Sequence, residues 1–206
     1  AYTFASCTSL TDAGLDGLGN WDTSSVTDMS YMFNADTSLT GTSLSLSGWD
    51  LSKVLDMSHL FDGCTSRTGE SLSLSSWDTT STTSFAYLFN NCEVLKDACV
   101  QGRNSWKTPA LVDASSMFNH CYALTGDGLD FSDWDTSKVT TLSYFMNYCT
   151  SLTTSEAIES WTNLTSLTTL EHFISNALDL RSLDLSSWRT SSALVSLNGT
   201  FINCPE

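Results

Sequence analysis

The residues of this chain that can take part in chemistry are seven cysteines, three histidines and 23 carboxylates. A hydrolytic triad requires a nucleophile, a histidine and a carboxylate to converge. However, His59 and His172 occupy one repeated position, and His120 adjoins Cys121. The sequence contains no C-x₂-C pair of the kind that binds zinc and no glycine-rich phosphate loop. We therefore expect no enzyme activity, no cofactor and no metal site.

Six of the seven cysteines occupy one recurring position. That position reads Cys7, Asp36, Cys64, Cys92, Cys121, Cys149, Ala177 and Cys204. Many cysteines in an extracellular protein would suggest a disulfide framework. Side chains that stack in parallel about 4.8 Å apart nevertheless have an awkward disulfide dihedral. We expect mostly reduced, buried thiols, with Cys92 and Cys99 as a candidate disulfide because Cys99 lies outside the column.

A second column carries aromatic and imidazole groups, and it is the candidate binding ridge. Its residues are Tyr2, Tyr31, His59, Tyr87, Tyr144 and His172, with Ser116 and Gly199 at the remaining two positions. Tyrosine offers contact area and a hydroxyl at low entropic cost, as binding interfaces favour. The alternative is that these side chains lie flat and only cover the backbone beneath them.

An aspartate column follows the tryptophans. It comprises Asp22, Asp50, Asp78 and Asp135. Short acidic side chains cap turns by accepting hydrogen bonds from nearby backbone N–H groups. A corner cap is therefore the first interpretation, and Ca²⁺ bound between repeats is the alternative, since carboxylates suit that ion.

These columns exist because the chain is repetitive. Its seven tryptophans are spaced by 27 to 29 residues: Trp21, Trp49, Trp77, Trp106, Trp134, Trp161 and Trp188. A further column, 12 or 13 residues after each tryptophan, is mostly phenylalanine. We expect both columns to be buried, because a coil of about 28 residues can bury its apolar side only against neighbouring coils.

Each repeat suggests three pieces of local structure. Segments such as "SLSLSGW" (43–49) alternate apolar and small polar residues, which predicts a half-buried strand. "WDTS" predicts a corner, and "MSYMF" predicts a helical or 3₁₀ turn. The predicted fold is a leucine-rich-repeat-like solenoid of about seven coils, each with a parallel strand, a corner and a short helical or 3₁₀ turn.

Composition limits the partners. The chain of 206 residues has 8 Lys and Arg against 23 Asp and Glu, a formal net charge of −15. This charge repels nucleic acid and anionic membranes over roughly a Debye length. No run approaches the roughly 20 apolar residues of a membrane span. A protein or glycan partner is expected, and nucleic acid is not.

The phrase W-D-T-S-x-V-T-x-M-S-x-M-F, most complete at 21–39 and 49–66, resembles the BspA-like leucine-rich-repeat surface proteins. Within that group it is similar to the bacterial-lipoprotein-type repeat of unknown function. The resemblance spans essentially the whole chain. It implies a secreted or cell-surface module that binds a partner, without catalytic residues. The fourth unit departs from the pattern with Arg103 and Lys107, which are a second candidate binding region.

Two functions from different classes follow. The first is a non-enzymatic recognition or adhesion module, and the alternative is a structural subunit that stacks in or caps a larger assembly. An extracellular or cell-surface location is expected from the acidic, Ser/Thr-rich composition and from glycosylation sequons at Asn163 and Asn198. We expect residues 1–206 to form one solenoid domain and a segment of a longer array. A partial coil occupies 1–10, and full coils run from about 11 to 204.

Overall fold

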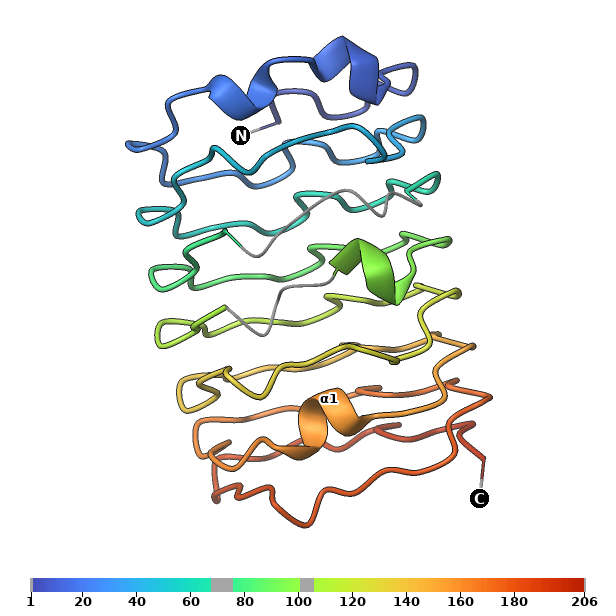
Figure 1. Ribbon diagram of the computed structural model, residues 1–206. Coiled ribbons are helices and arrows are strands. Elements are labelled where there is room, and N and C mark those ends of the chain that lie inside the picture. Colours follow the sequence, from blue (N-terminus) through green and yellow to red (C-terminus); the bar gives the residue numbers. More distant parts are fainter. Residues whose placement is uncertain (1, 68–75, 101–105, 206) are drawn as a thin grey trace.

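The computed structural model describes residues 2–67, 76–100 and 106–205. Successive repeats form coils of the backbone that stack on one another in register (Figure 1). Isolated parallel backbone bridges join equivalent residues of adjacent coils. The main column of bridged residues is Asp28, Asp56, Ser84, Asp113, Thr141, Thr169 and Ser196. The sequence repeat is therefore also a structural repeat.

Regular secondary structure is sparse among the described residues. It consists of the 3₁₀ helices η1 (Asp12–Leu15), η2 (Leu18–Asn20) and η3 (Asp97–Val100) and the α-helix α1 (Glu156–Glu159). Each contains only one turn and precedes the tryptophan of its repeat in the sequence.

The predicted leucine-rich-repeat solenoid with parallel strands is wrong, because the described residues contain no β-strand. The expected alternation is present at 43–47, where Leu44 and Leu46 are buried and the serines are exposed. A ladder also needs an extended neighbour. The preceding coil holds η1 and η2 beside this segment, and α1 occupies the equivalent place beside the extended segments of the fifth and seventh coils. Among the described residues, strand pairing is therefore blocked beside η1, η2 and α1.

The helical turn predicted at "MSYMF" is also wrong. The N–H groups of Met29, Tyr31, Phe33 and Ala35 donate to carbonyls of the next coil at 2.7–3.0 Å. The intervening N–H groups, such as that of Met32, donate to the carbonyl three residues back. Along this segment, every second N–H group donates to the next coil and the N–H groups between them donate within the same coil. The result is a series of tight turns, and not a helix or a pleated strand.

The two predicted aromatic columns form part of the core, together with leucine, valine, isoleucine, methionine and cysteine side chains of the same coils. The expected burial fails for Trp21, which is 48% exposed, and for Phe201, which is 41% exposed. Phe33, Phe61 and Phe89 are fully buried, and their ring centroids lie 5.4 and 5.7 Å apart. The described tryptophans from Trp49 to Trp161 are at most 6% exposed. Several donate their indole N–H to a carbonyl of the preceding coil, as Trp49 does to Leu18 at 2.9 Å. The tryptophan column is therefore structural.

Candidate binding surface

The Tyr/His column forms a stack of rings along the coils. Centroids lie 4.5 Å apart between Tyr2 and Tyr31, 4.2 Å between Tyr31 and His59, and 4.4 Å between His59 and Tyr87. Interplanar angles are at most 10° in this set. The structure therefore brings together four of the residues that the sequence nominated.

The remaining two candidates form a separate pair. Tyr144 and His172 stack at 5.0 Å. Ser116, which is buried, interrupts the column between Tyr87 and Tyr144. The ring surface therefore consists of a four-ring segment and a two-ring segment.

A special backbone conformation holds these side chains. All eight positions of the column have φ between 49° and 62°, including Tyr31 at 57°. Tyr31, for example, is the third residue of the four-residue turn 29–32, which is closed by the hydrogen bond from Met32 N–H to Met29 O. A positive φ at the third position characterises type II turns and usually selects glycine or asparagine. Here it directs the ring away from the buried Phe33.

The energetic balance explains why aromatic residues tolerate this conformation. The left-handed region costs a non-glycine residue roughly 1–2 kcal/mol. Stacking of an aromatic pair gains about 0.5–1.5 kcal/mol, and the N–H of each residue also bonds to the next coil. Burial by neighbouring rings raises the pKa of Tyr31, with the adjacent Tyr2 as a further cause. The hydroxyl therefore stays protonated at neutral pH.

An amide ladder, which the sequence did not suggest, runs beside the ring stack. Side-chain amides donate from each coil to the preceding one at 2.7–3.2 Å, in the order Asn203, Asn176, Asn147, Asn119, Asn90 and finally Asp62. Asp62 also lies 2.8 Å from Nδ1 of His59. The carboxylate therefore ends the ladder and anchors the imidazole of the ring stack. The recurring asparagine three or four residues after the ring position was the available signal.

A second group of rings was also missed. His120 stacks on Tyr148 at 4.8 Å and meets Tyr122 edge to face at 5.8 Å. His120 and Tyr148 belong to another column with positive φ, four residues after the Tyr/His column. Its other members are small or polar: Ser6, Ala35, Gly63, Asn91, Asn176 and Asn203. Because the aromatic residues occur in only two coils, no repeat pattern revealed them.

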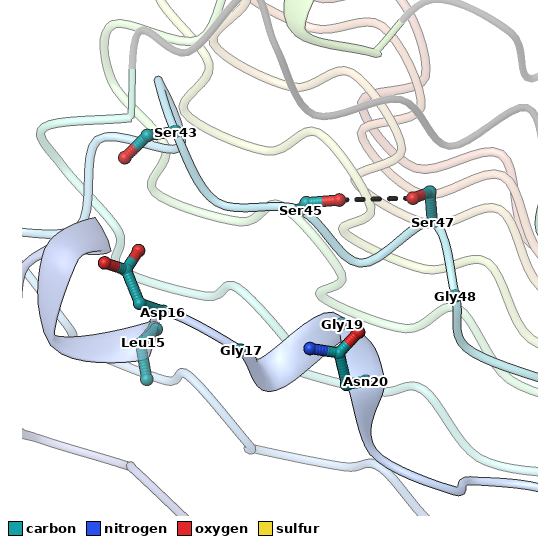
Figure 2. A pocket seen from close by; sticks show the side chains of 9 residues that line it. All are labelled: Leu15, Asp16, Gly17, Gly19, Asn20, Ser43, Ser45, Ser47 and Gly48. Atoms are coloured by element: carbon teal, nitrogen blue, oxygen red, sulfur yellow. Dashed lines mark hydrogen bonds between the residues drawn. The ribbon is translucent and has the colours of Figure 1, made fainter.

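A polar groove of about 300 Å³ lies between the first two coils (Figure 2). It is lined by residues around η2 and by the serines of the extended segment 43–47, and the hydroxyls of Ser45 and Ser47 lie 3.1 Å apart. The backbones approach closely: a Cβ on Gly19 would lie 2.7 Å from the Ser45 carbonyl oxygen, and one on Gly48 would lie 2.2 Å from that of Gly19. The groove can offer hydrogen bonds to a small polar molecule.

The aspartate column caps the corners, as expected. The Asp22 carboxylate accepts from the N–H of Ser24 at 3.1 Å, and Asp50 accepts from Ser52 at 2.9 Å. These hydrogen bonds lower the pKa of both carboxyl groups. Among the described residues no cluster of three or more His, Cys, Asp or Glu side chains could hold a metal ion.

The cysteine column contains free, mostly buried thiols. Cys64, Cys92 and Cys149 each donate Sγ–H to a phenylalanine carbonyl of the preceding coil at 3.1 Å. Burial raises the pKa of the Cys64 thiol to about 12. Cys92 is one of these free thiols, so it does not form the predicted disulfide with Cys99 in this structure; the side chain of Cys99 itself lies outside the described residues.

Asp36 is the exception in the cysteine column. Its side chain is fully buried, and its Oδ1 accepts from the N–H of Cys7 at 2.7 Å. Its Oδ2 is buried without a hydrogen-bond partner. Burial raises the pKa of Asp36 to about 6. Ionisation of this buried carboxyl group is therefore energetically unfavourable in the folded chain.

The other nominated residues are distributed as follows. Lys107 is exposed and pairs with Asp133 at 2.6 Å, whereas Arg103 lies outside the described residues. The sequon residues Asn163 and Asn198 are exposed. In the first sequon the Asn163 side-chain oxygen accepts from the Thr165 hydroxyl at 3.0 Å. Glycosylation at either asparagine stays a prediction.

The described helices are all too short or too polar to cross a bilayer. The fold and the surface define a protein of stacked, sequence-repeated coils with aromatic columns inside and outside. The chain belongs to the family described as Mycoplasma protein of unknown function, DUF285, whose model matches residues 1–131 and 126–206. That match supports a repeat family and does not extend to the leucine-rich-repeat group named above. No curated protein and no solved structure gives a significant match.

Proposed function

We propose that this protein is a non-enzymatic recognition or adhesion module that binds a protein partner through its Tyr/His column. The observation that carries this proposal is the continuous ring stack of Tyr2, Tyr31, His59 and Tyr87. Tyr2 is 62% exposed and Tyr87 is 36% exposed. Aromatic residues held rigidly at a surface lose little conformational entropy on binding and are common in interfaces.

The stacking geometry favours a protein over a glycan. Sugars bind aromatic side chains by packing against the ring face, and inside this stack the faces cover each other. Ring edges and hydroxyl groups remain available, and these suit the mixed polar and apolar contacts of a protein interface. A glycan partner is the other outcome that the experiment below separates.

An extracellular or cell-surface location is part of the proposal. The resemblance of the W-D-T-S-x-V-T-x-M motif to BspA-like surface proteins supports it, as do the exposed sequon residues Asn163 and Asn198. The net charge of −15 favours a basic partner over an anionic one.

The test is binding of the purified chain to intact cells from its native surroundings. Replacing Tyr31 and Tyr87 together by alanine should leave the circular dichroism spectrum unchanged and weaken binding about tenfold or more, since interface tyrosines are frequent hot spots. The control is replacement of the exposed Leu55 and Leu178, which lie outside the column. Equal binding by the tyrosine variant and the wild type would reject the proposal. Loss of binding after periodate treatment of the cells, but not after protease treatment, would identify the partner as a glycan.

The alternative is a structural subunit that stacks in or caps a larger assembly. Sedimentation velocity distinguishes the two functions: assembly predicts concentration-dependent association, whereas recognition through the ring column predicts a monomer.

A further inference from the structure

A corner of aromatic rings lies apart from the Tyr/His column. Tyr148 is stacked on His120 with an interplanar angle of 10°, and Tyr122 stands at 88° to His120. The two tyrosine rings are therefore nearly perpendicular, with the imidazole between them. Tyr122 is 37% exposed and Tyr148 is 41% exposed, so both are accessible to a ligand.

The fold does not require these aromatic residues. Other coils have asparagine at the position of Tyr148, as in Asn91 and Asn176, and threonine at the position of Tyr122, as in Thr65. Those coils stack through the same backbone hydrogen bonds. Rings confined to two adjacent coils, at positions where most other coils carry small or polar residues, indicate a role other than packing.

The surroundings of the corner are acidic. Glu93 occupies the position equivalent to Tyr122 in the preceding coil, and its carbonyl accepts from the N–H of Ala123 at 3.2 Å. The Glu93 carboxylate acts electrostatically on His120 and on Tyr122. Burial lowers the pKa of His120, so the imidazole is neutral at pH 7 and does not repel a cation.

The chain already contains a cation–π contact between a guanidinium group and aromatic rings. The central carbon of Arg67 lies 3.9 Å from the centroid of the Phe61 ring and 5.9 Å from that of Phe89. Arginine is the side chain most often found in cation–π contacts, because its planar group stacks on ring faces while its N–H groups still reach a carboxylate.

We propose that Tyr122, His120 and Tyr148, together with the Glu93 carboxylate, form a site for an arginine side chain of a partner protein. The guanidinium stacks on an exposed tyrosine face and its N–H groups are directed to Glu93. The site is separate from the Tyr/His column, so it stands or falls independently of the function proposed above. The negative net charge of the chain assists the approach of a basic partner.

The test uses N-acetyl-arginine amide as the probe, titrated into the full chain labelled with ¹³C in its tyrosine rings. We expect saturable shifts of the Tyr122 and Tyr148 ring signals at millimolar probe. N-acetyl-citrulline amide, which has nearly the same shape without the charge, should cause none. Equal shifts with citrulline, or equal affinity for N-acetyl-lysine amide, would overturn the choice of arginine.

Three variants locate the site. Tyr148→Asn and Tyr122→Thr introduce residues that other coils carry at the same positions, so the fold should be kept. Each should weaken arginine binding about three- to tenfold, as should Glu93→Gln. The matched control is Leu55→Thr, which replaces an exposed residue outside both ring groups by the residue found at Thr83 in the next coil and should leave affinity unchanged. Unchanged affinity in Tyr148→Asn, or an equal loss in Leu55→Thr, would refute the site.

Discussion

Replacement of Asp36 by asparagine should stabilise this protein at neutral and alkaline pH. Asp36 is fully buried, and one of its carboxylate oxygens has no hydrogen-bond partner. Its pKa is raised from 3.8 to about 6 in the folded chain. Folding therefore favours the protonated form, and the ionised form carries a penalty that asparagine does not.

The magnitude and sign follow from linkage. A rise of about two pKa units corresponds to about 3 kcal/mol, since each unit is worth about 1.4 kcal/mol. The native group holds its proton more tightly than the unfolded one. Its contribution to stability is therefore fully present below about pH 3.8 and is lost as the pH rises through about 6. Between roughly pH 4 and pH 7, the free energy of unfolding of the wild type thus falls by about 3 kcal/mol relative to that of Asp36→Asn.

The assay is thermal unfolding of both proteins from pH 4 to pH 8, followed by circular dichroism. We expect the melting temperature of Asp36→Asn to exceed that of the wild type by about 6–12 °C at pH 8, and the two to converge toward pH 4. Only the difference in melting temperature between the two proteins isolates the effect of Asp36. Other carboxylates with lowered pKa values, such as Asp12 and Asp22, lose their stabilising effect in both proteins as the pH falls. Melting curves that stay parallel over the whole range would refute the reasoning. Asp36→Cys restores the residue of the column and should behave like Asp36→Asn at pH 8.

Three further predictions concern packing and hydrogen bonding. Trp77→Ser should lower the melting temperature by about 10 °C, because the indole is 3% exposed and stacks on Trp106 at 5.9 Å; an unaffected melting curve would contradict a buried tryptophan column. Gly48→Ala should destabilise the first two coils, since its Cβ would lie 2.2 Å from a backbone oxygen; hydrogen exchange of the amides in 15–50 should rise, with more distant coils as the internal control. Asn119→Ala should cost about 1–2 kcal/mol in urea unfolding by breaking the amide ladder, while Asn163→Ala, at an exposed position, should cost less than half as much.

What the sequence revealed was the position of side chains and not the path of the backbone. Spacing of Trp49 and Phe33 in fixed columns predicted their burial, because only one register of stacked coils buries both. The alternation at 43–47 also predicted correctly which side chains point inward. The alternation could not predict strand pairing, because pairing also requires an extended segment in the neighbouring coil. Beside 43–47 the neighbouring coil contains the helices η1 and η2.

The site was predicted in the same uneven way. The Tyr/His column followed from the repeat, and the structure stacks Tyr31 on His59. Its left-handed backbone gave no signal, because tyrosine and histidine are not the residues that usually mark a positive φ. The corner at His120 was not predicted, since it depends on a departure from the repeat in two coils. Asp36 could be recognised from the sequence as a polar residue in a column of buried thiols, but its raised pKa could not.

The direction of the hydrogen bonds between coils has a mechanical consequence. They join each coil to the next along the axis on which the coils stack (Figure 1). A pulling force applied along this axis acts in the direction of those bonds, so the junctions open one at a time and do not have to shear together. Each detached coil releases about 28 residues, or roughly 90–100 Å of slack chain at full extension. Under tension the molecule would therefore lengthen in regular steps while the remaining coils stay folded, and would dissipate the load as an extensible tether.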